Sequence, residues 1–456
     1  MKRIPLTILL ILCIVLSSVT FSFGADKTLD LTGQSAILID ATTGEILYEY
    51  NSHVLHYPAS TTKIMTGILA LENLDLSDYA DIDEEASFTG GSRIYLLEGE
   101  EITVEELLYA LFLESANDAA VALAKKISGT VENFAKLMNR KARELGAINT
   151  NFVNPHGLHD DQHVSTAYDL ALIARYAMQN QLFRDFVSTY QYTIEATNLQ
   201  DTRYLYNTNR MLYDTVNKVM INGQTRVCKY DDVTGIKTGY TSKAGGCLVA
   251  GAKRGDTELI AVTMASTDMG RFADCIMLLD YGFDNFKTVN SMQAGENLGI
   301  VAVKRGANNR VEVATAEPVY VTLPIEASEN LLRTEVELYE SLTAPVEKGQ
   351  KAGVVKIYAG DELLAEYDAV TVEDIEEGGI LSAFGITDET AKKIYRYVIA
   401  TIIMLFLLLV IYIMIKRRQI KKRRLARQRE REKLRRLKQR EKELWEQEYW
   451  RTRHFL

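Results

Sequence analysis

A serine and a lysine stand one helical turn apart at the start of a long apolar run, YPASTTKIMTGILALENL, which begins at Tyr57. A serine hydroxyl is a poor nucleophile at neutral pH, because too little of it is ionised, so it needs a base within hydrogen-bond distance. Ser60 and Lys63, at i and i+3, would share one helix face. Burial would lower the pKa of the amine and make it a base. A helix-initiating serine beside a surface lysine is the alternative interpretation.

Ser115 and Asn117 form a second candidate pair, in LFLESANDAAVALA, where two helical patterns meet. A kink between helices would project both side chains into a cleft. Ser115 could then relay a proton, and Asn117 could hold an amide of a peptide substrate. Considered alone, the serine is better explained as a helix cap.

Lys237, Thr238 and Gly239 lie within a predicted strand, in GIKTGYTSKAGGCLVAG. Glycine leaves room for an extended peptide at a strand edge, while the lysine and the threonine offer a cation and a hydroxyl to a carboxylate. An exposed edge-strand lysine that limits aggregation is the alternative.

Positioning these groups requires an α+β domain, with one antiparallel sheet assembled from both ends of the segment and helices packed against it. Capping-box patterns at Thr103 with Glu106 and at Thr166 with Asp169 indicate two helix starts. The expected strands are residues 35–40, 45–50, 233–241, 247–252 and 258–265, and the expected helices include residues 59–74, 131–145 and 271–283.

The two ends of the chain predict export and anchoring. Lys2 and Arg3 precede an uncharged apolar stretch and small residues, which is typical of a secretory signal. Tyr397–Ile415 carries no charge and is long enough to cross a hydrocarbon core of about 30 Å. The lysines and arginines that follow predict a single-pass protein of the cell membrane, with its catalytic domain extracytoplasmic and its C-terminal tail cytoplasmic.

Together these patterns predict a chain of six parts. Short alternating stretches after the α+β domain indicate a small all-β domain. The parts are a signal peptide (1–24), a catalytic domain (25–287), the all-β domain (288–372), a juxtamembrane linker (373–393), a transmembrane helix (394–415) and a basic tail (416–456).

The net charge of −9 hides an asymmetry, since the tail from Lys416 holds 18 basic and 6 acidic residues and the rest of the chain is strongly acidic. An acidic exported body argues against nucleic acid as its partner, whereas the tail is compatible with anionic lipid headgroups. Cys228, Cys247 and Cys275 are an odd number of cysteines beyond the signal, so we expect buried free thiols.

His156, His159 and His163 could be drawn as zinc ligands. Their segment is rich in Asn, Pro, Gly and Asp, so helical spacing does not bring them together, and a wall of the cleft is the better interpretation. We expect no metal and no cofactor. A Ser-His-Asp hydrolase is disfavoured because no G-x-S-x-G elbow surrounds any serine.

Taken together, the SxxK, SxN and KTG motifs, in this order, resemble those of the penicillin-recognising serine enzymes. The chain is most similar to the low-molecular-mass penicillin-binding proteins that act as serine-type D-alanyl-D-alanine carboxypeptidases, peptidase family S11. The similarity extends to the hairpin before Ser60, to the small all-β domain, and to the stretches NPHGLHDDQHVSTAYDLA, KTGYT and RFADC.

This resemblance implies a role for each motif residue. Ser60 is similar to the acylated nucleophile and Lys63 to its general base, and Ser115 would pass a proton to the leaving amine. Asn117 would orient the substrate amide. Lys237 and Thr238 would bind the terminal carboxylate, and Arg271 would assist them, although its match to the family is looser. The backbone N–H groups of Ser60 and Tyr240 would form the oxyanion hole.

The implied reaction removes the last D-alanine from a peptidoglycan stem pentapeptide, and β-lactams would acylate the same serine as covalent inhibitors. A β-lactamase is one alternative, although the chain has no E-x-x-L-N segment to activate a deacylating water. A non-catalytic, membrane-anchored envelope scaffold is the other. The sequence names no partner for the tail.

Overall fold

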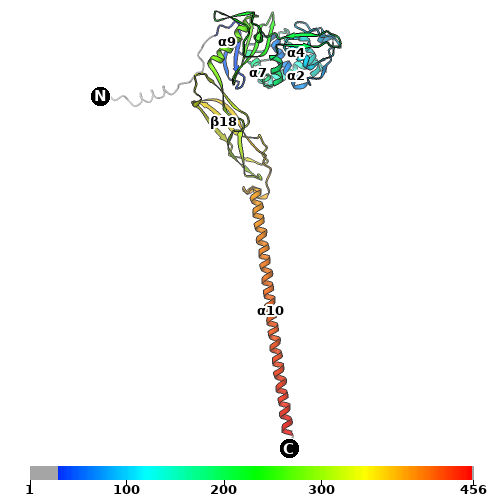
Figure 1. Cartoon of the computed structure of the whole chain (residues 1–456), viewed down its shortest axis with the longest axis vertical. Coiled ribbons are helices and arrows are strands. Elements are labelled where there is room, and N and C mark those ends of the chain that lie inside the picture. Colours follow the sequence, from blue (N-terminus) through cyan, green and yellow to red (C-terminus); the bar gives the residue numbers. More distant parts are fainter. Residues whose placement is uncertain (1–28, 454–456) are drawn as a thin grey trace, which may run out of the picture. The chain divides into compact units, whose positions relative to one another are not determined.

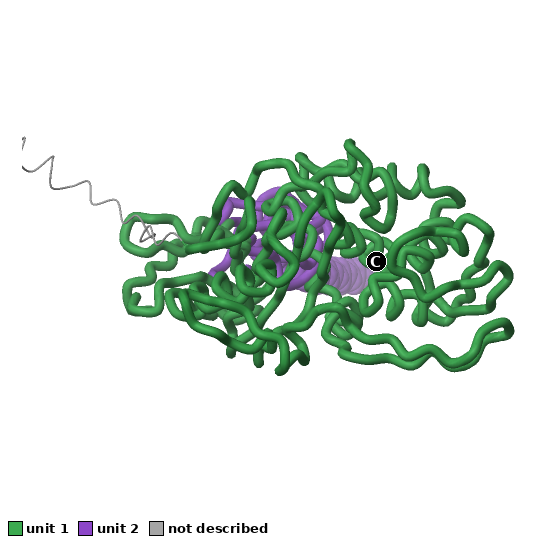
Figure 2. The backbone as a smooth tube through the Cα atoms, turned by 90° about the horizontal axis from the view of Figure 1, so that it is seen from above, with its two compact units in different colours: residues 1–296, 317–337, 354–367 green, residues 297–316, 338–353, 368–456 purple. Residues whose placement is uncertain are grey.

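The computed structural model describes residues 29–453, so the expected signal peptide lies outside the described part of the chain. The chain divides into two compact units (Figure 2): residues 1–296, 317–337 and 354–367 form the first, and residues 297–316, 338–353 and 368–456 form the second.

One five-stranded sheet forms the centre of the first unit. Its strand order is β2-β1-β11-β10-β9, and every neighbouring pair is antiparallel. The predicted assembly of one sheet from both ends of the domain is therefore confirmed. The strands are β1 (Ser35–Asp40), β2 (Ile46–Tyr50), β9 (Val233–Thr241), β10 (Gly245–Arg254) and β11 (Thr257–Ser266).

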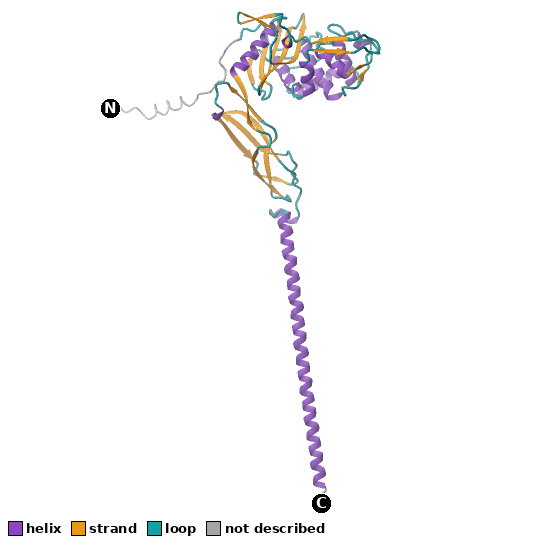
Figure 3. Cartoon of the chain, viewed as in Figure 1, coloured by secondary structure: helices purple, strands orange, loops and turns teal. Residues whose placement is uncertain are grey.

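Alternate residues of this sheet enter two separate apolar cores, because successive side chains of a strand point to opposite faces. In β1, Ile37 and Ile39 join the larger core with most of the helices, whereas Leu38 joins a smaller core with Phe272 and Leu279 of α9. Figures 1 and 3 show these helices beside the sheet strands. The helices are α2 (Lys63–Asn73), α3 (Glu84–Ser87), α4 (Val104–Phe112), α5 (Asn117–Ser128), α6 (Val131–Glu144), α7 (Ala167–Ala177), α8 (Gln181–Ser188) and α9 (Gly270–Asn285).

The two predicted helix starts differ in one respect. Thr103 and Glu106 form a reciprocal capping box before α4. Thr166 accepts a hydrogen bond from the backbone N–H of Asp169 before α7, but the Asp169 carboxylate binds Thr150 Oγ1 and Asn149 N. This cap therefore also ties α7 to a loop that is distant in sequence.

Short two-stranded sheets complete the first unit. They pair β3 (Tyr79–Ala80) with β4 (Ile102–Thr103), β5 (Gln191–Ile194) with β6 (Arg203–Tyr206), and β7 (Lys218–Ile221) with β8 (Gln224–Val227). The first two of these sheets lie beside the larger core, and the third, β7 with β8, lies beside the smaller core and α9. Cys228, Cys247 and Cys275 are free and buried, as predicted.

Residues 286–371, after α9, form β-strands joined by turns and contain no α-helix, as predicted. β12 (Phe286–Met292) pairs with β15 (Val319–Pro324), and the other strands form a sheet of order β16-β18-β19-β14-β13-β17. The strands of this sheet are β13 (Asn297–Lys304), β14 (Arg310–Thr315), β16 (Leu332–Leu338), β17 (Ser341–Thr343), β18 (Lys351–Ala359) and β19 (Glu362–Thr371).

The described chain ends in one long helix, α10 (Asp388–Arg453). It starts inside the predicted linker and continues through the apolar stretch into the basic tail. Among the described residues, this helix alone is long and apolar enough to span a membrane.

Candidate active site

Ser60 lies in a tight turn that two other segments hold in place. The turn is the 3-10 helix η1 (Ala59–Thr62), which leads into α2, so the single helix expected from residue 59 begins with a tighter turn. Ala59 adopts a left-handed backbone conformation with φ of 48°, which is uncommon for a residue other than glycine. A Cβ at Gly157 would lie 1.8 Å from the Ala59 carbonyl oxygen, and one at Gly239 would lie 3.1 Å from Ser60 N. Glycines thus let a loop and strand β9 approach the serine closely.

Lys63 is fully buried and hydrogen-bonded to three oxygen atoms. Its Nζ lies 3.1 Å from Ser60 Oγ, 2.7 Å from Asn117 Oδ1 and 2.8 Å from the His156 carbonyl oxygen. Burial, and next the positive charge of Lys237, lower the pKa of Lys63 well below its ordinary value. The pair that the SxxK spacing predicted is therefore in direct contact, in an environment that favours the neutral amine.

The three partners of Lys63 determine where its lone pair points when the amine is neutral. A neutral amine has two N–H groups and one lone pair. The carbonyl oxygens of Asn117 and His156 can only accept, so they take both N–H groups. The lone pair is left for Ser60, whose hydroxyl can donate to it. The geometry thus orients the base toward the nucleophile.

The orientation of Asn117 is fixed by its own contacts. Its Nδ2 donates to the Gly90 carbonyl oxygen at 2.7 Å, which leaves Oδ1 for Lys63, and its backbone N–H donates to Ser92. The next residue, Asp118, is buried and accepts hydrogen bonds from the backbone N–H groups of Ile94 and Leu96. The start of α5 therefore holds residues 90–96 beside the site.

Ser115 occupies the kink between α4 and α5 that the sequence predicted. Its φ is 59°, and its Oγ is buried without a hydrogen-bond partner within residues 29–453. A strained backbone and an unsatisfied buried hydroxyl commonly mark functional positions. This hydroxyl is free to exchange a proton.

Lys237 and Thr238 lie in β9, the strand at one edge of the central sheet. Lys237 is buried, and its Nζ donates to the Thr238 carbonyl oxygen at 3.3 Å. Burial, and next the charge of Arg271, lower the pKa of Lys237 to about 7. The Thr238 hydroxyl lies 2.7 Å from that of Thr208. The predicted cation and hydroxyl are therefore present on an edge strand.

Arg271 lies in α9, beneath β9. One of its terminal nitrogens donates to the Gly239 carbonyl oxygen at 2.7 Å, and the other forms an ion pair with Asp268 at 2.8 Å. Its Nε is buried and has no partner in the described part of the chain. Arg271 supports the strand directly and adds positive charge next to Lys237.

Three features of this site were not predicted. The main-chain carbonyl of His156 binds Lys63, Gly157 admits Ala59, and Thr208 orients Thr238. The interpretation of this histidine-containing segment as a wall of the cleft placed the first two features near the site without identifying either contact. The histidine side chains have other contacts: His163 bonds to Thr62 Oγ1, and the ring of His159 packs edge-on against Tyr57.

Comparisons with known proteins agree on one family. The family model described as D-alanyl-D-alanine carboxypeptidase, peptidase S11, matches residues 22–268, and the model for the C-terminal domain of penicillin-binding protein 5 matches residues 286–377. D-alanyl-D-alanine carboxypeptidase DacF of Bacillus subtilis is 37% identical over 355 residues, which cover 76% of this chain and 87% of DacF. DacA of Escherichia coli is 32% identical over 361 residues, covering 76% and 85% of the two chains.

Solved structures resemble the chain over the same region. Penicillin-binding protein 5 from Haemophilus influenzae matches with a TM-score of 0.63 and 30% identity, covering 77% of this chain and 100% of that protein. The carboxypeptidase DacD from Francisella tularensis matches with a TM-score of 0.56 and 28% identity, covering 77% and 95%.

Proposed function

The chain belongs to the D-alanyl-D-alanine carboxypeptidases of peptidase family S11, serine hydrolases of the penicillin-recognising fold, and from that premise we propose how its own residues perform the reaction. The substrate is the stem pentapeptide of peptidoglycan, and Ser60 is the nucleophile. The contact of Ser60 Oγ with the buried amine of Lys63 is the observation that carries this assignment.

Acylation begins when Ser60 gives its proton to Lys63 and its oxygen attacks the carbonyl carbon between the two D-alanines. The backbone N–H groups of Ser60 and Tyr240 stabilise the oxyanion, and a single such donor is worth roughly 3 kcal/mol in other enzymes. The proton then passes through Ser115 to the departing amine as the C–N bond breaks. D-alanine leaves, and the rest of the peptide stays on Ser60 as an ester.

Deacylation reverses the proton movements. Water attacks the ester carbon, its proton passes to Lys63, and the Ser60 oxygen leaves with a proton returned to it. The products are a shortened peptide acid and the free enzyme. A β-lactam acylates Ser60 in the same way, but its leaving nitrogen stays tethered to the acyl group. We expect slow release of penicillin because no glutamate motif activates the water.

Recognition of the free carboxylate makes this enzyme a carboxypeptidase. Lys237 and Thr238 hold that group, Arg271 adds positive charge, and Asn117 orients the amide before the scissile bond. Burial of Lys237 removes competing water, so a bound carboxylate interacts with it more strongly than it would at an exposed site.

We also propose that α10 anchors the protein in the cell membrane as a single span at residues 394–415. The seven basic residues of segment 416–424 support a cytoplasmic position for the tail, and therefore an extracytoplasmic catalytic domain. The proposed parts of the chain are those stated for the sequence, with the catalytic domain at residues 25–287 and the all-β domain at 288–372.

Two measurements on the detergent-solubilised full-length protein test the function. One follows free D-alanine released from a stem-pentapeptide mimic, and the other follows covalent labelling by a fluorescent penicillin. Ser60→Ala should abolish both, whereas Ser77→Ala, at an exposed serine, should change neither. A penicillin label that survives Ser60→Ala would refute the assignment. Transfer of the acyl group to an added amine without net hydrolysis would instead indicate a transpeptidase.

A further inference from the structure

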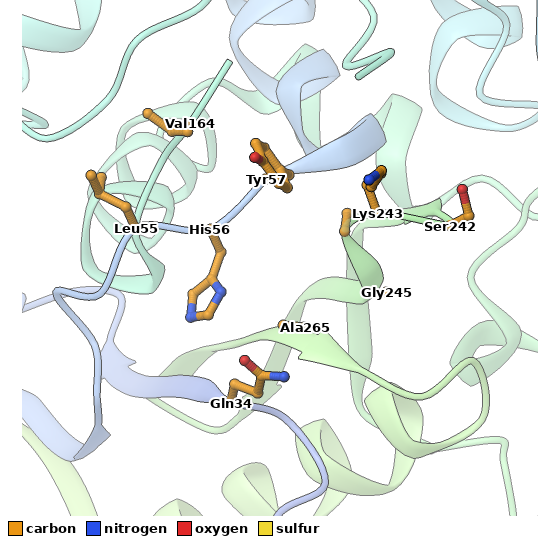
Figure 4. A pocket seen from close by; sticks show the side chains of 10 residues that line it. Gln34, Leu55, His56, Tyr57, Val164, Ser242, Lys243, Gly245 and Ala265 are labelled. Atoms are coloured by element: carbon orange, nitrogen blue, oxygen red, sulfur yellow. The ribbon is translucent and has the colours of Figure 1, made fainter. Parts of the chain in front are cut away.

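A pocket of about 520 Å³ lies at the end of the β9–β10 hairpin (Figure 4). One wall is Leu55–Tyr57, just before the turn Ala59–Thr62 that carries Ser60 (the nucleophile turn), and the other is Ser242–Gly245, the turn between the two strands. Gln34, Val164 and Ala265 complete the lining. No carboxylate side chain lines this pocket, and the mechanism above does not use it.

This inference rests on the proposed function, in which the substrate residue before the two D-alanines lies near this pocket. Lys237 and Thr238 hold the terminal carboxylate, and the scissile carbonyl lies at the N–H group of Tyr240. The peptide therefore runs antiparallel to β9, with its earlier residues beside Thr241 and beyond. At about 3.3 Å per strand residue, Ser242 is only about 7 Å past Tyr240. The side chain just before the two alanines can reach the pocket.

His56 presents a hydrogen-bond acceptor to this pocket. The Ser35 hydroxyl donates to the Asn51 carbonyl oxygen at 2.6 Å, so it has only its lone pairs left for His56 Nε2, which lies 2.9 Å away. His56 Nε2 must therefore carry the hydrogen, which leaves Nδ1 with its lone pair. Figure 4 shows the imidazole of His56 directed into the space above Gln34. Burial lowers the pKa of His56, which keeps the ring neutral at pH 7.

Lys243 supplies a positive charge on the opposite wall. It is exposed in the hairpin turn and forms no ion pair within residues 29–453. The ring of Tyr57 lies between Lys243 and His56 in Figure 4, where it can pack against methylene groups. The pocket thus combines an acceptor, a cation and an apolar middle.

We propose that this pocket binds the side chain of the residue that precedes the two D-alanines, and that this side chain ends in an ammonium and a carboxylate on one carbon. His56 Nδ1 and the Gln34 amide oxygen accept from the ammonium group, and Lys243 binds the carboxylate. The pocket therefore selects among stem peptides, whereas β9 recognises only their common end.

Two acetylated tripeptides test this proposal, because they differ by one carboxylate. One is lysyl-D-Ala-D-Ala, and the other has a diaminopimelyl residue, which is lysine with a carboxylate on its ε-carbon, in the first position. The measurement is kcat/KM for D-alanine release by the full-length protein. We expect the diaminopimelyl peptide to be preferred about fivefold to tenfold, the range of a partly exposed charge-assisted hydrogen bond.

Lys243→Ala should bring the ratio of the two kcat/KM values close to one. Lys253→Ala is the matched control, because Lys253 is an exposed lysine at the far end of β10 and does not line the pocket. Acetylation of the distal amine of the diaminopimelyl peptide should lower its kcat/KM about fivefold, because it removes the positive charge and leaves only one N–H group to donate to His56 and Gln34.

Equal kcat/KM values for the two peptides in the unmodified protein would overturn the proposal, as would a ratio that survives Lys243→Ala. Either result, with normal D-alanine release and penicillin labelling, would leave the proposed function intact. Failure to release D-alanine from either peptide, together with no penicillin label on Ser60, would overturn the proposed function as well.

Discussion

Gly157→Ala should nearly abolish acylation of Ser60 without touching any group that reacts. The new Cβ would lie 1.8 Å from the Ala59 carbonyl oxygen, whereas real Cβ contacts are essentially never under 3.0 Å. The loop and the nucleophile turn must therefore separate by at least 1.2 Å. A misplacement of about 1 Å can cost roughly a hundredfold in rate, so we expect acylation to fall by about that factor.

The matched control is Gly129→Ala. Gly129, the C-cap of α5, also has a positive φ (75°, against 84° for Gly157), but a Cβ there would meet no atom within 4 Å. Both variants should lose about 1 kcal/mol of stability through backbone strain, and the melting temperature of Gly157→Ala should fall further because its Cβ also forces the loop away from the Ala59 carbonyl oxygen. Only Gly157→Ala should lose penicillin acylation in stopped-flow measurements. Equal acylation rates in the two variants would refute the idea that this close approach positions Ser60.

Three further predictions concern the groups around the nucleophile. Ser115→Ala should lower kcat for D-alanine release about a hundredfold or more. The melting temperature should not fall, because the Ser115 hydroxyl has no hydrogen-bond partner in the described part of the chain that the substitution would leave unsatisfied. A large loss of stability would contradict this prediction. Thr208→Val should lower kcat/KM about fivefold by freeing the Thr238 hydroxyl, whereas an unchanged value would mean that this contact orients nothing useful. Lys237 has a pKa of about 7, and a bound carboxylate must raise this pKa because it stabilises the protonated amine. Substrate should therefore bind most tightly below pH 7, where Lys237 is protonated, and KM should rise up to about tenfold per pH unit above pH 7. A KM that falls as the pH rises would contradict the assigned role.

The comparisons support the carboxypeptidase rather than a β-lactamase or a non-catalytic scaffold. Local patterns predicted much of this outcome, because Ser60 and Lys63 lie where a helix begins, the Ser115 motif lies where one helix ends and the next begins, and Lys237 lies within a strand. The spacing of Ser60 and Lys63 brings them together through one turn of chain, whichever fold surrounds it. Similarly, the glycine-bearing turns that separate residues 233–241 from the two following stretches predicted an antiparallel strand there, and that strand carries Lys237.

Contacts between distant segments could not be read from such patterns. The binding of Lys63 to the His156 carbonyl joins residues 93 positions apart and involves the backbone, which has the same chemistry at every residue. Thr208 and Thr238 meet only because the loop after β6 returns to β9. Nor do the residue types around His56 reveal which of its ring nitrogens carries the hydrogen, since Ser35, at the start of β1, decides this.

By itself, the sequence determined the candidate reacting groups, the helices and strands that bear them, and the apolar span near the C-terminus, since all of these depend on residue type and short spacing. Only the tertiary structure decided the direction of the Lys63 lone pair, the closeness of Gly157 to the nucleophile turn and the polarity of the pocket beside it. Those properties arise when segments far apart in the chain are packed to within hydrogen-bond distance, and no local spacing encodes them.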